Sequence, residues 1–235
     1  MILVPDASLR FRVLDLETTG ASANDHVVEI AAVDLIGLDI IPIGSHLVTP
    51  LVPISPEASA VHHLTDSDVV GAPDLEALLP VYMDIDRVAD VDVFVAHNWA
   101  FEAQWLGEHL RGRPAICTYK AAIRVWPEAP GHSNQTLRYW LKPEGLSSSI
   151  ATPPHRPLPD ALVTAHILRE LLRVATVEEL ITWTDEPALL PRVTFGRHRG
   201  CSWSEVPTDY LAWVVERSEL GHDIKFTAEH HRGRT

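Results

Sequence analysis

The sequence predicts an α/β protein with a small appendage at its C-terminal end, and three observations support this fold class. Apolar, β-branched segments fill most of residues 10–48, as expected for neighbouring strands. The segment VDVFVA at residues 91–96 runs directly into a helical apolar pattern, which is typical of a buried strand followed by a helix. The segment DALVTAHILRELLRV, which starts at Asp160, has the apolar spacing of a long amphipathic helix.

The N-terminal part of the chain is expected to alternate strands and turns before the first helices. Three segments are predicted to form antiparallel strands joined by short turns: residues 10–20, 26–36 and 38–48. After a proline-rich loop, we expect one helix at residues 57–63 with Ser55 as its N-cap. A second helix is expected at residues 72–84 despite an internal proline.

The remaining chain divides into a main domain and an appendage. A helix with Asn98 as its N-cap follows the strand at 91–96. Further segments are predicted as a helix or a strand followed by a helix at 115–125, a short helix at 134–141 and a loop rich in Pro, Ser and Gly at 143–157. We expect a main domain at residues 1–176, a linker at 177–191 and a hairpin-plus-helix appendage at 192–235.

The bulk composition excludes several classes of protein. With 46% hydrophobic and 22% charged residues, the chain is typical of a globular protein. Its net charge of −13 argues against a protein that coats nucleic acid, but not against an enzyme that grips one chain end through bound divalent cations. Two cysteines make a disulfide framework improbable, and neither the N-terminus MILVPDAS nor any long apolar run indicates a signal peptide or a membrane span. We therefore expect a cytoplasmic protein.

Two carboxylates, Asp15 and Glu17, interrupt the first predicted strand in the segment RFRVLDLETTG. Because side chains alternate along a strand, both point to the same face, with Cα atoms roughly 6.6 Å apart at about 3.3 Å per residue. Such a pair can bind one hard divalent cation or two adjacent ones. The spacing alone also fits two solvated acids at the end of a strand.

Two further acids and a histidine extend this pair. Glu102 follows the strand at 91–96, where it either joins a site at the carboxyl end of that strand or complements the dipole of the next helix. His155 lies on a proline-rich loop that leads to Asp160 at the start of a long helix. Carboxylate oxygens select Mg²⁺ or Mn²⁺ over Zn²⁺, and two such ions can stabilise a phosphoryl displacement. A histidine on a loop can accept the proton of the attacking water.

The order of these motifs resembles that of the DEDDh 3′→5′ exonucleases. The segments DLETTG, HHLTD, VAHNWAFEAQWL and HRPLPDALVTA carry the three exonuclease motifs, and SHLVTPLVPISPEA, ICTYKAAIRVWP and TFGRHRG extend the match to nearly the whole chain. The resemblance implies an RNase H-like fold, with a mixed five-stranded sheet flanked by helices. It also implies hydrolysis of single-stranded DNA from its 3′ end to nucleoside 5′-monophosphates, in DNA repair or turnover.

The resemblance assigns roles residue by residue. The implied metal ligands are four acids that would hold two Mg²⁺ ions, with Mn²⁺ as a substitute: Asp15, Glu17, Glu102 and Asp160. His155 is the implied general base. The residues implied to seat the terminal nucleotide are Thr18, Thr19, Asn98 and, by packing against the base, Leu64.

Glu102 departs from the family pattern, in which the second motif ends in aspartate. Glutamate keeps the charge but moves the carboxylate by about 1.5 Å, roughly one C–C bond, whereas metal sites require placement within a few tenths of an ångström. We expect hydrolysis to be retained. Two alternatives stay open: the same chemistry on RNA ends or in polymerase proofreading, and a catalytically weakened nucleic-acid-binding module.

The appendage is rich in basic and aromatic residues. Four of them are candidates for contacts to a nucleic-acid strand by charge and stacking: Arg197, His198, Arg199 and Trp203. The alternative is a packed mini-domain with a solvated basic turn.

Overall fold

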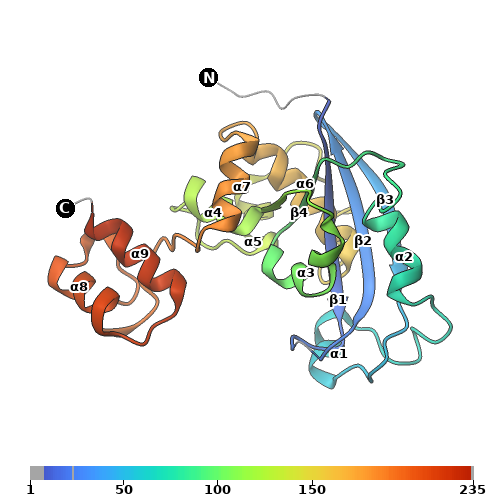
Figure 1. Cartoon of the computed structure of the whole chain (residues 1–235), viewed down its shortest axis with the longest axis horizontal. Helices are drawn as coiled ribbons and strands as arrows, with labels where there is room; N and C mark the ends of the chain where they lie inside the picture. Colours follow the sequence, from blue (N-terminus) through green and yellow to red (C-terminus); the bar gives the residue numbers. More distant parts are fainter. Residues whose placement is uncertain (1–7, 23, 234–235) are drawn as a thin grey trace.

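The protein, described for residues 8–22 and 24–233 in a computed structural model, is built around a five-stranded sheet (Figure 1). Its strands are β1 (Arg10–Thr18), β2 (Val27–Ile36), β3 (Asp39–Leu47), β4 (Val93–Ala96) and β5 (Ala115–Cys117). Their spatial order is β3-β2-β1-β4-β5, with β1, β2 and β3 antiparallel and with β4 and β5 parallel to β1. The predicted mixed α/β sheet is confirmed.

Helices cover both faces of this sheet and form a separate C-terminal unit. The helices are α1 (Pro56–His62), α2 (Leu75–Tyr82), α3 (Trp99–Leu106), α4 (Thr118–Val125), α5 (Asn134–Leu141), α6 (Pro157–Leu171), α7 (Val177–Asp185), α8 (Thr208–Arg217) and α9 (His222–Arg232). The long helix α6 packs across β1, β2 and β3, while α4 and α5 pack against α6, and α7 packs against α4 and β5. Ser55 caps α1 through its side chain, as expected.

Two apolar cores lie on opposite faces of the sheet because side chains alternate along each strand. Phe11 and Val13 of β1 join the core beneath α6. Leu14 and Leu16 join the second core, which includes residues of α2 and α3. Residues at odd positions of β1 therefore face α6, and this parity continues to the two acids at the end of the strand.

One acid that interrupts β2 has a structural partner. Asp34 is buried and accepts bonds from Arg12 Nε at 2.7 Å and Nη2 at 2.9 Å. Arg12 also donates to the carbonyl of Val81 at 2.6 Å, near the end of α2. Both charges are thus compensated, as buried charges must be, and the pair fixes α2 on the sheet.

The structure differs from expectation at three places. Helix α6 begins at Pro157, so Asp160 lies in its first turn rather than at its start. The segment expected to be a linker, 177–191, begins with α7, which buries Leu180 in the core beneath α6. The expected hairpin of the appendage is reduced to one isolated bridge in the described residues, between Arg192 and Ser202, followed by two helices.

Two remaining expectations concern the membrane and the N-terminus. Within residues 8–22 and 24–233, every helix is too short or too polar to cross a membrane. The segment on which the absence of a signal peptide was inferred lies mostly in residues 1–7, outside the described residues.

Candidate active site

The carboxyl end of β1 places two acids under the N-terminus of α6. Asp15 and Glu17 share the face of β1 that carries Phe11 and Val13, so both point toward α6. The strands β4 and β5, which are parallel to β1, end at the same edge. Ligand sites in α/β folds form at this edge, because loops leave the sheet there.

Asp160 reaches the site from the first turn of α6 and is held in a fixed orientation. The backbone N–H of His155 donates to its Oδ2 at 2.6 Å, and Gln135 Nε2 donates to its Oδ1 at 2.7 Å. Asn134 Nδ2 donates to the Asp160 backbone carbonyl at 3.0 Å. Helix α5 and the loop before α6 therefore both position this carboxylate.

Glu102 enters from α3, which follows β4. Its side chain is buried, with 5% of the residue exposed. Its Oε2 has no hydrogen-bond partner within the part of the chain that the structure describes. Buried polar atoms are almost always satisfied, so an orphaned carboxylate oxygen in a cluster of acids fits a cation ligand.

The electrostatics of the four acids support the same conclusion. Burial, followed by the charges of Asp160, Glu102 and Glu17, raises the pKa of Asp15 well above its ordinary value. Burial and the charge of Asp160 raise the pKa of Glu17 to about 8, and burial raises the pKa of Glu102 to about 8. Burial also raises the pKa of Asp160. Without a cation the charged forms repel one another, and a bound divalent cation would remove this penalty.

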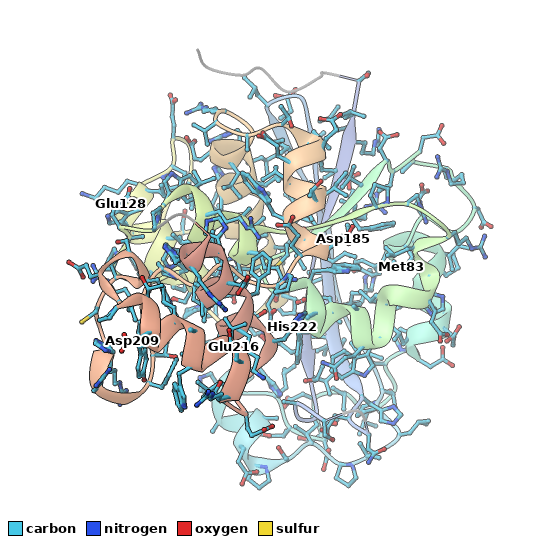
Figure 2. All side chains as sticks on the ribbon, turned by 60° about the vertical axis from the view of Figure 1, so that its left-hand side comes forward. Met83, Glu128, Asp185, Asp209, Glu216 and His222 are labelled. Carbon is cyan, nitrogen blue, oxygen red and sulfur yellow. The ribbon has the colours of Figure 1, made fainter. Side chains whose placement is uncertain are left out.

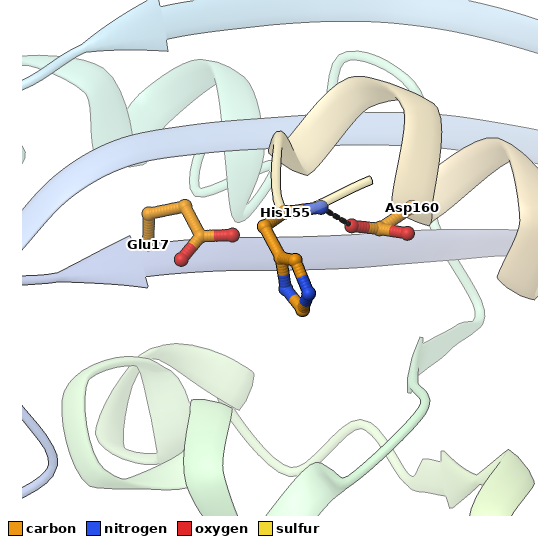
Figure 3. A group of neighbouring side chains, drawn as sticks. All are labelled: Glu17, His155 and Asp160. Atoms are coloured by element: carbon orange, nitrogen blue, oxygen red, sulfur yellow. Dashed lines mark hydrogen bonds between the residues drawn. The ribbon is translucent and has the colours of Figure 1, made fainter. Parts of the chain in front are cut away.

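His155 lies between Glu17 and Asp160 (Figure 3). Its imidazole is exposed, and one ligand atom each from Glu17, His155 and Asp160 lies within 4.8 Å of the others. The backbone of His155 is left-handed, with φ at 58°. Non-glycine residues adopt this conformation rarely and often at functional sites.

Two adjoining pockets open around these residues. The first, of about 340 Å³, is lined by the four acids and by Leu16, His97, Asn98, Phe101, Ser133, Asn134, Gln135 and His155. The second, of about 380 Å³, is lined by Glu17, Thr18, Gly20, Ala21, Ser55, Glu57, Ala58, Val61, His62 and Phe101. Glu17 and Phe101 line both, so the two pockets adjoin at these side chains.

The structure brings some of the predicted nucleotide-binding residues to these pockets and not others. Asn98 takes the N-cap position of α3 without a side-chain cap bond, and it lines the first pocket. Thr18 lines the second. Thr19 is buried and donates to Asp25 Oδ1 at 2.8 Å. Leu64 is buried in a small core beside Val28, so neither Thr19 nor Leu64 lines either of these two pockets.

The structure also reveals residues that the sequence analysis did not assign to the site. Arg156 binds Glu29 through Nε at 2.7 Å and Nη2 at 2.9 Å, and Gln135 orients Asp160. His97 bonds to Thr118 Oγ1 and to a backbone carbonyl, and burial lowers the pKa of His97 to about 4. A buried acid in an apolar strand, such as Glu29, was the one available signal, because it requires a partner.

Comparison with known proteins shows the family of this chain. The model of one protein family, described as Exonuclease, matches residues 13–168. Exodeoxyribonuclease 10 of Escherichia coli is 34% identical over 230 residues, which cover 94% of this chain and 97% of that protein. The structure of exonuclease X in complex with 5′ overhanging duplex DNA aligns with a TM-score of 0.61 at 35% identity, covering 74% of this chain and 99% of that one. E. coli exonuclease I in complex with an oligonucleotide, 16% identical with a TM-score of 0.54, shares the fold; the match covers 75% of this chain and 43% of that one.

Proposed function

The chain belongs to the exonuclease family and is a 3′→5′ exodeoxyribonuclease, and from that premise we propose that it releases nucleoside 5′-monophosphates from single-stranded DNA. The resemblance to the DEDDh exonucleases is confirmed, and exodeoxyribonuclease 10 matches along almost the full length of both chains. The alternatives, an exoribonuclease, a proofreading subunit or a weakened binding module, are not favoured by these relatives.

The convergence of four carboxylates from β1, α3 and α6 carries this proposal. Asp15, Glu17, Glu102 and Asp160 would hold two Mg²⁺ ions, with Mn²⁺ as a substitute. Bound divalent cations at such a site polarise the phosphate and stabilise charge on the attacking and leaving oxygens. The orphaned oxygen of Glu102 and the raised pKa values of the acids fit this donor set.

We assign proton transfer to His155. Its exposed imidazole lies beside Glu17 and Asp160, where a neutral ring can accept the proton of the attacking water. The backbone bond from His155 to Asp160 holds the loop against the acids. The backbone of His155 is therefore fixed, while its imidazole stays exposed to solvent and substrate.

The terminal nucleotide would occupy the first pocket, with the next nucleotide in the second. Asn98 lines the first pocket and would contact the terminal nucleotide, while Thr18 lines the second and would contact the next nucleotide. Thr19 would act indirectly, because its Oγ1 accepts the His26 N–H at 3.0 Å and donates to Asp25, which shapes the turn after β1. Leu64 would likewise support the wall behind α1 rather than touch the base.

We further propose a role in DNA repair or turnover and a cytoplasmic location. Cys117 and Cys201 are both free thiols in the described chain, which agrees with a reducing compartment.

The decisive experiment follows mononucleotide release from matched single-stranded DNA and RNA oligomers with a 3′ label, with and without Mg²⁺. We expect release of nucleoside 5′-monophosphate from DNA only in the presence of Mg²⁺, and loss of release in Asp15→Asn. Faster release from RNA would favour the exoribonuclease, and DNA binding without release or metal binding would favour the weakened module.

A further inference from the structure

The C-terminal unit, residues 192–233, lies outside the segment that the exonuclease family matches. It has its own small core, which includes Val193, Trp203 and Leu211. It is joined to the main domain by defined bonds: the Ala188 N–H donates to Asp223 of α9 at 2.9 Å, and a second backbone N–H donates to Thr227 at 2.9 Å. The unit is thus folded and anchored, and its surface requires an explanation of its own.

Trp203, which the sequence suggested as a contact to a nucleic-acid strand, is not on this surface. Trp203 is 0% exposed and packs in the core of the unit. The accessible aromatic surface lies instead along α8. Phe195 stacks on Tyr210 with ring centroids 6.4 Å apart, and Tyr210 lies 5.3 Å from Trp213, which is 43% exposed.

Phe195, Tyr210 and Trp213 form a row of aromatic rings, which we call the aromatic ladder. The middle ring, that of Tyr210, is held rigidly. Gly196 has a φ of 59°, and a Cβ at this position would lie 2.6 Å from the Tyr210 hydroxyl. The close approach holds the ring of Tyr210 against the turn before α8. Rigid aromatic rings lose little conformational entropy on binding, so such a ladder is suited to stacking with a flat ligand.

Two basic side chains lie beside the ladder. The Arg197 guanidinium lies over the Tyr210 ring, 5.0 Å from its centroid. Arg217 is exposed and follows Tyr210 and Trp213 at helical spacing, so the three side chains share one stripe of α8. We call Arg197, Tyr210, Trp213 and Arg217 the aromatic stripe.

Acidic neighbours of the stripe are few. The two acids of α8 are Asp209 and Glu216, labelled in Figure 2, where the unit is turned forward. Glu216 pairs with Arg232 of α9 at 2.8 Å, so its charge is compensated away from the stripe. Residues 192–235 carry seven Lys and Arg against six Asp and Glu, whereas residues 1–191 carry 12 against 26. The unit is therefore the part of the chain that repels a polyanion least.

We propose that the aromatic stripe binds single-stranded nucleic acid, with a base stacked on the exposed Trp213 and phosphates paired with Arg197 and Arg217. Stacking accepts any base, and the guanidinium groups accept the phosphates, as in other surfaces that bind single strands without sequence preference. This contact lies outside the pockets of the proposed active site and would retain a strand whose end is being processed. It goes beyond the proposed function, which needs only the acids and His155.

The test measures binding of a fluorescent oligothymidylate of about 20 nucleotides to the full chain in EDTA, so that no hydrolysis occurs. We expect Trp213→Leu, which keeps an apolar side chain, to weaken binding about tenfold, and Trp213→Phe to keep most of the affinity. Arg197→Ala and Arg217→Ala should each reduce the slope of log affinity against log salt by about 0.7. Arg87→Ala, an exposed arginine outside the unit, is the matched control.

Two further arms make the outcome decisive. Equal affinity of the wild-type, Leu and Phe proteins would overturn the proposal. Binding of a polyglutamate peptide with the same dependence on Trp213 would also overturn it, in favour of an acidic protein partner. Hydrolysis of the p-nitrophenyl ester of thymidine 5′-monophosphate with Mg²⁺, which presents one nucleotide, separates this proposal from the proposed function. Failure of the proposed function removes this hydrolysis, whereas failure of the stripe leaves it intact.

Discussion

Arg156 and Glu29 form a two-bonded ion pair directly beside the candidate base, with Nε–Oε2 at 2.7 Å and Nη2–Oε1 at 2.9 Å. Glu29 is buried on β2, opposite Glu17 of β1, and also accepts from Ser45 Oγ at 2.6 Å. The pair therefore fastens the residue next to His155 to the sheet. It also compensates one acid of a crowded group, which leaves the others for a cation.

Arg156→Ala should lower kcat for single-stranded DNA about tenfold with little change in KM, because the loop carrying His155 loses its anchor. It should also cost about 2 kcal/mol of unfolding free energy. This is less than the loss for a fully buried pair, since the Arg156 side chain is 38% exposed. Steady-state kinetics and urea unfolding measure both effects. Arg173→Ala, which breaks an ion pair with Glu170 at the C-terminal end of α6, is the control, and an unchanged kcat in a folded Arg156→Ala protein would contradict the anchoring role.

Gln135 has the corresponding role on the other side of Asp160. Its Nε2 donates to Asp160 Oδ1, and its Oε1 accepts from the buried Arg138 at 3.0 Å. We expect Gln135→Ala to weaken Mn²⁺ binding about tenfold to hundredfold, as is usual when a group that orients a metal ligand is removed. Calorimetric titration with Mn²⁺ measures this affinity. Gln104 of α3 lines neither pocket, so Gln104→Ala is the control and should bind Mn²⁺ as the wild type does. Equal Mn²⁺ affinities of the wild type and both variants would refute the role of Gln135.

Glu102 tests whether the departure from the family pattern is compensated by the fold. Glu102 is buried and its Oε2 is unpartnered within the described residues. We therefore expect the longer side chain to place its carboxylate where it can bind a cation. Glu102→Asp withdraws the carboxylate by about 1.5 Å and should lower kcat about tenfold rather than raise it. Glu102→Gln keeps the length without the charge and should lower kcat further. Higher activity in Glu102→Asp would identify the glutamate as a defect instead of an adapted ligand.

The parts of this architecture that were predictable are those written in local patterns. Alternating apolar residues specify β1 and β2, and the acids of the site stand out because a strand or an apolar helix tolerates a charge only for a reason. Asp15 and Glu17 interrupt such a strand, and Asp160 lies in the first turn of such a helix. These features could be predicted without knowing which distant residues the segments contact.

The remaining features depend on contacts between distant segments. Arg156 and Glu29 are separated by 127 positions, so no local period connects them. Trp203 lies in a short 3₁₀ turn without periodicity, and therefore its sequence context could not show whether it faces the core or the solvent. Helix α7 is short, and its one local signal is the capping box of Thr176 and Glu179.

The raised pKa values predict how stability depends on pH in the metal-free protein. Glu17 and Glu102 each have a pKa raised from 4.5 to about 8, so the folded state binds more protons than the unfolded state between these values. The free energy of unfolding should therefore fall as pH rises through this window. Burial lowers the pKa of His97 and His166 from 6.5 to about 4, which acts in the opposite direction below 6.5.

Thermal unfolding between about pH 6.5 and 8 thus isolates the acids. We expect Tm to fall with pH in EDTA and to fall less with Mg²⁺, because the cation binds the charged carboxylates of the folded state. The double variant Glu17→Gln, Glu102→Gln should lose most of this pH dependence. A metal-free Tm that rises over the same interval would contradict the electrostatic picture.

His155→Ala should abolish turnover while leaving nucleotide binding largely intact, because the imidazole is exposed and supports no buried contact through its ring. Single-turnover kinetics with Mg²⁺ and equilibrium binding of thymidine 5′-monophosphate measure the two properties separately.

Since a neutral imidazole is required, wild-type activity should rise toward mildly alkaline pH, and a flat rate from acid to about pH 9 would argue against this base. His222→Ala, an exposed histidine at the start of α9, should retain full activity. Loss of folding in His155→Ala, seen as a lost unfolding transition, would instead make His155 a structural residue.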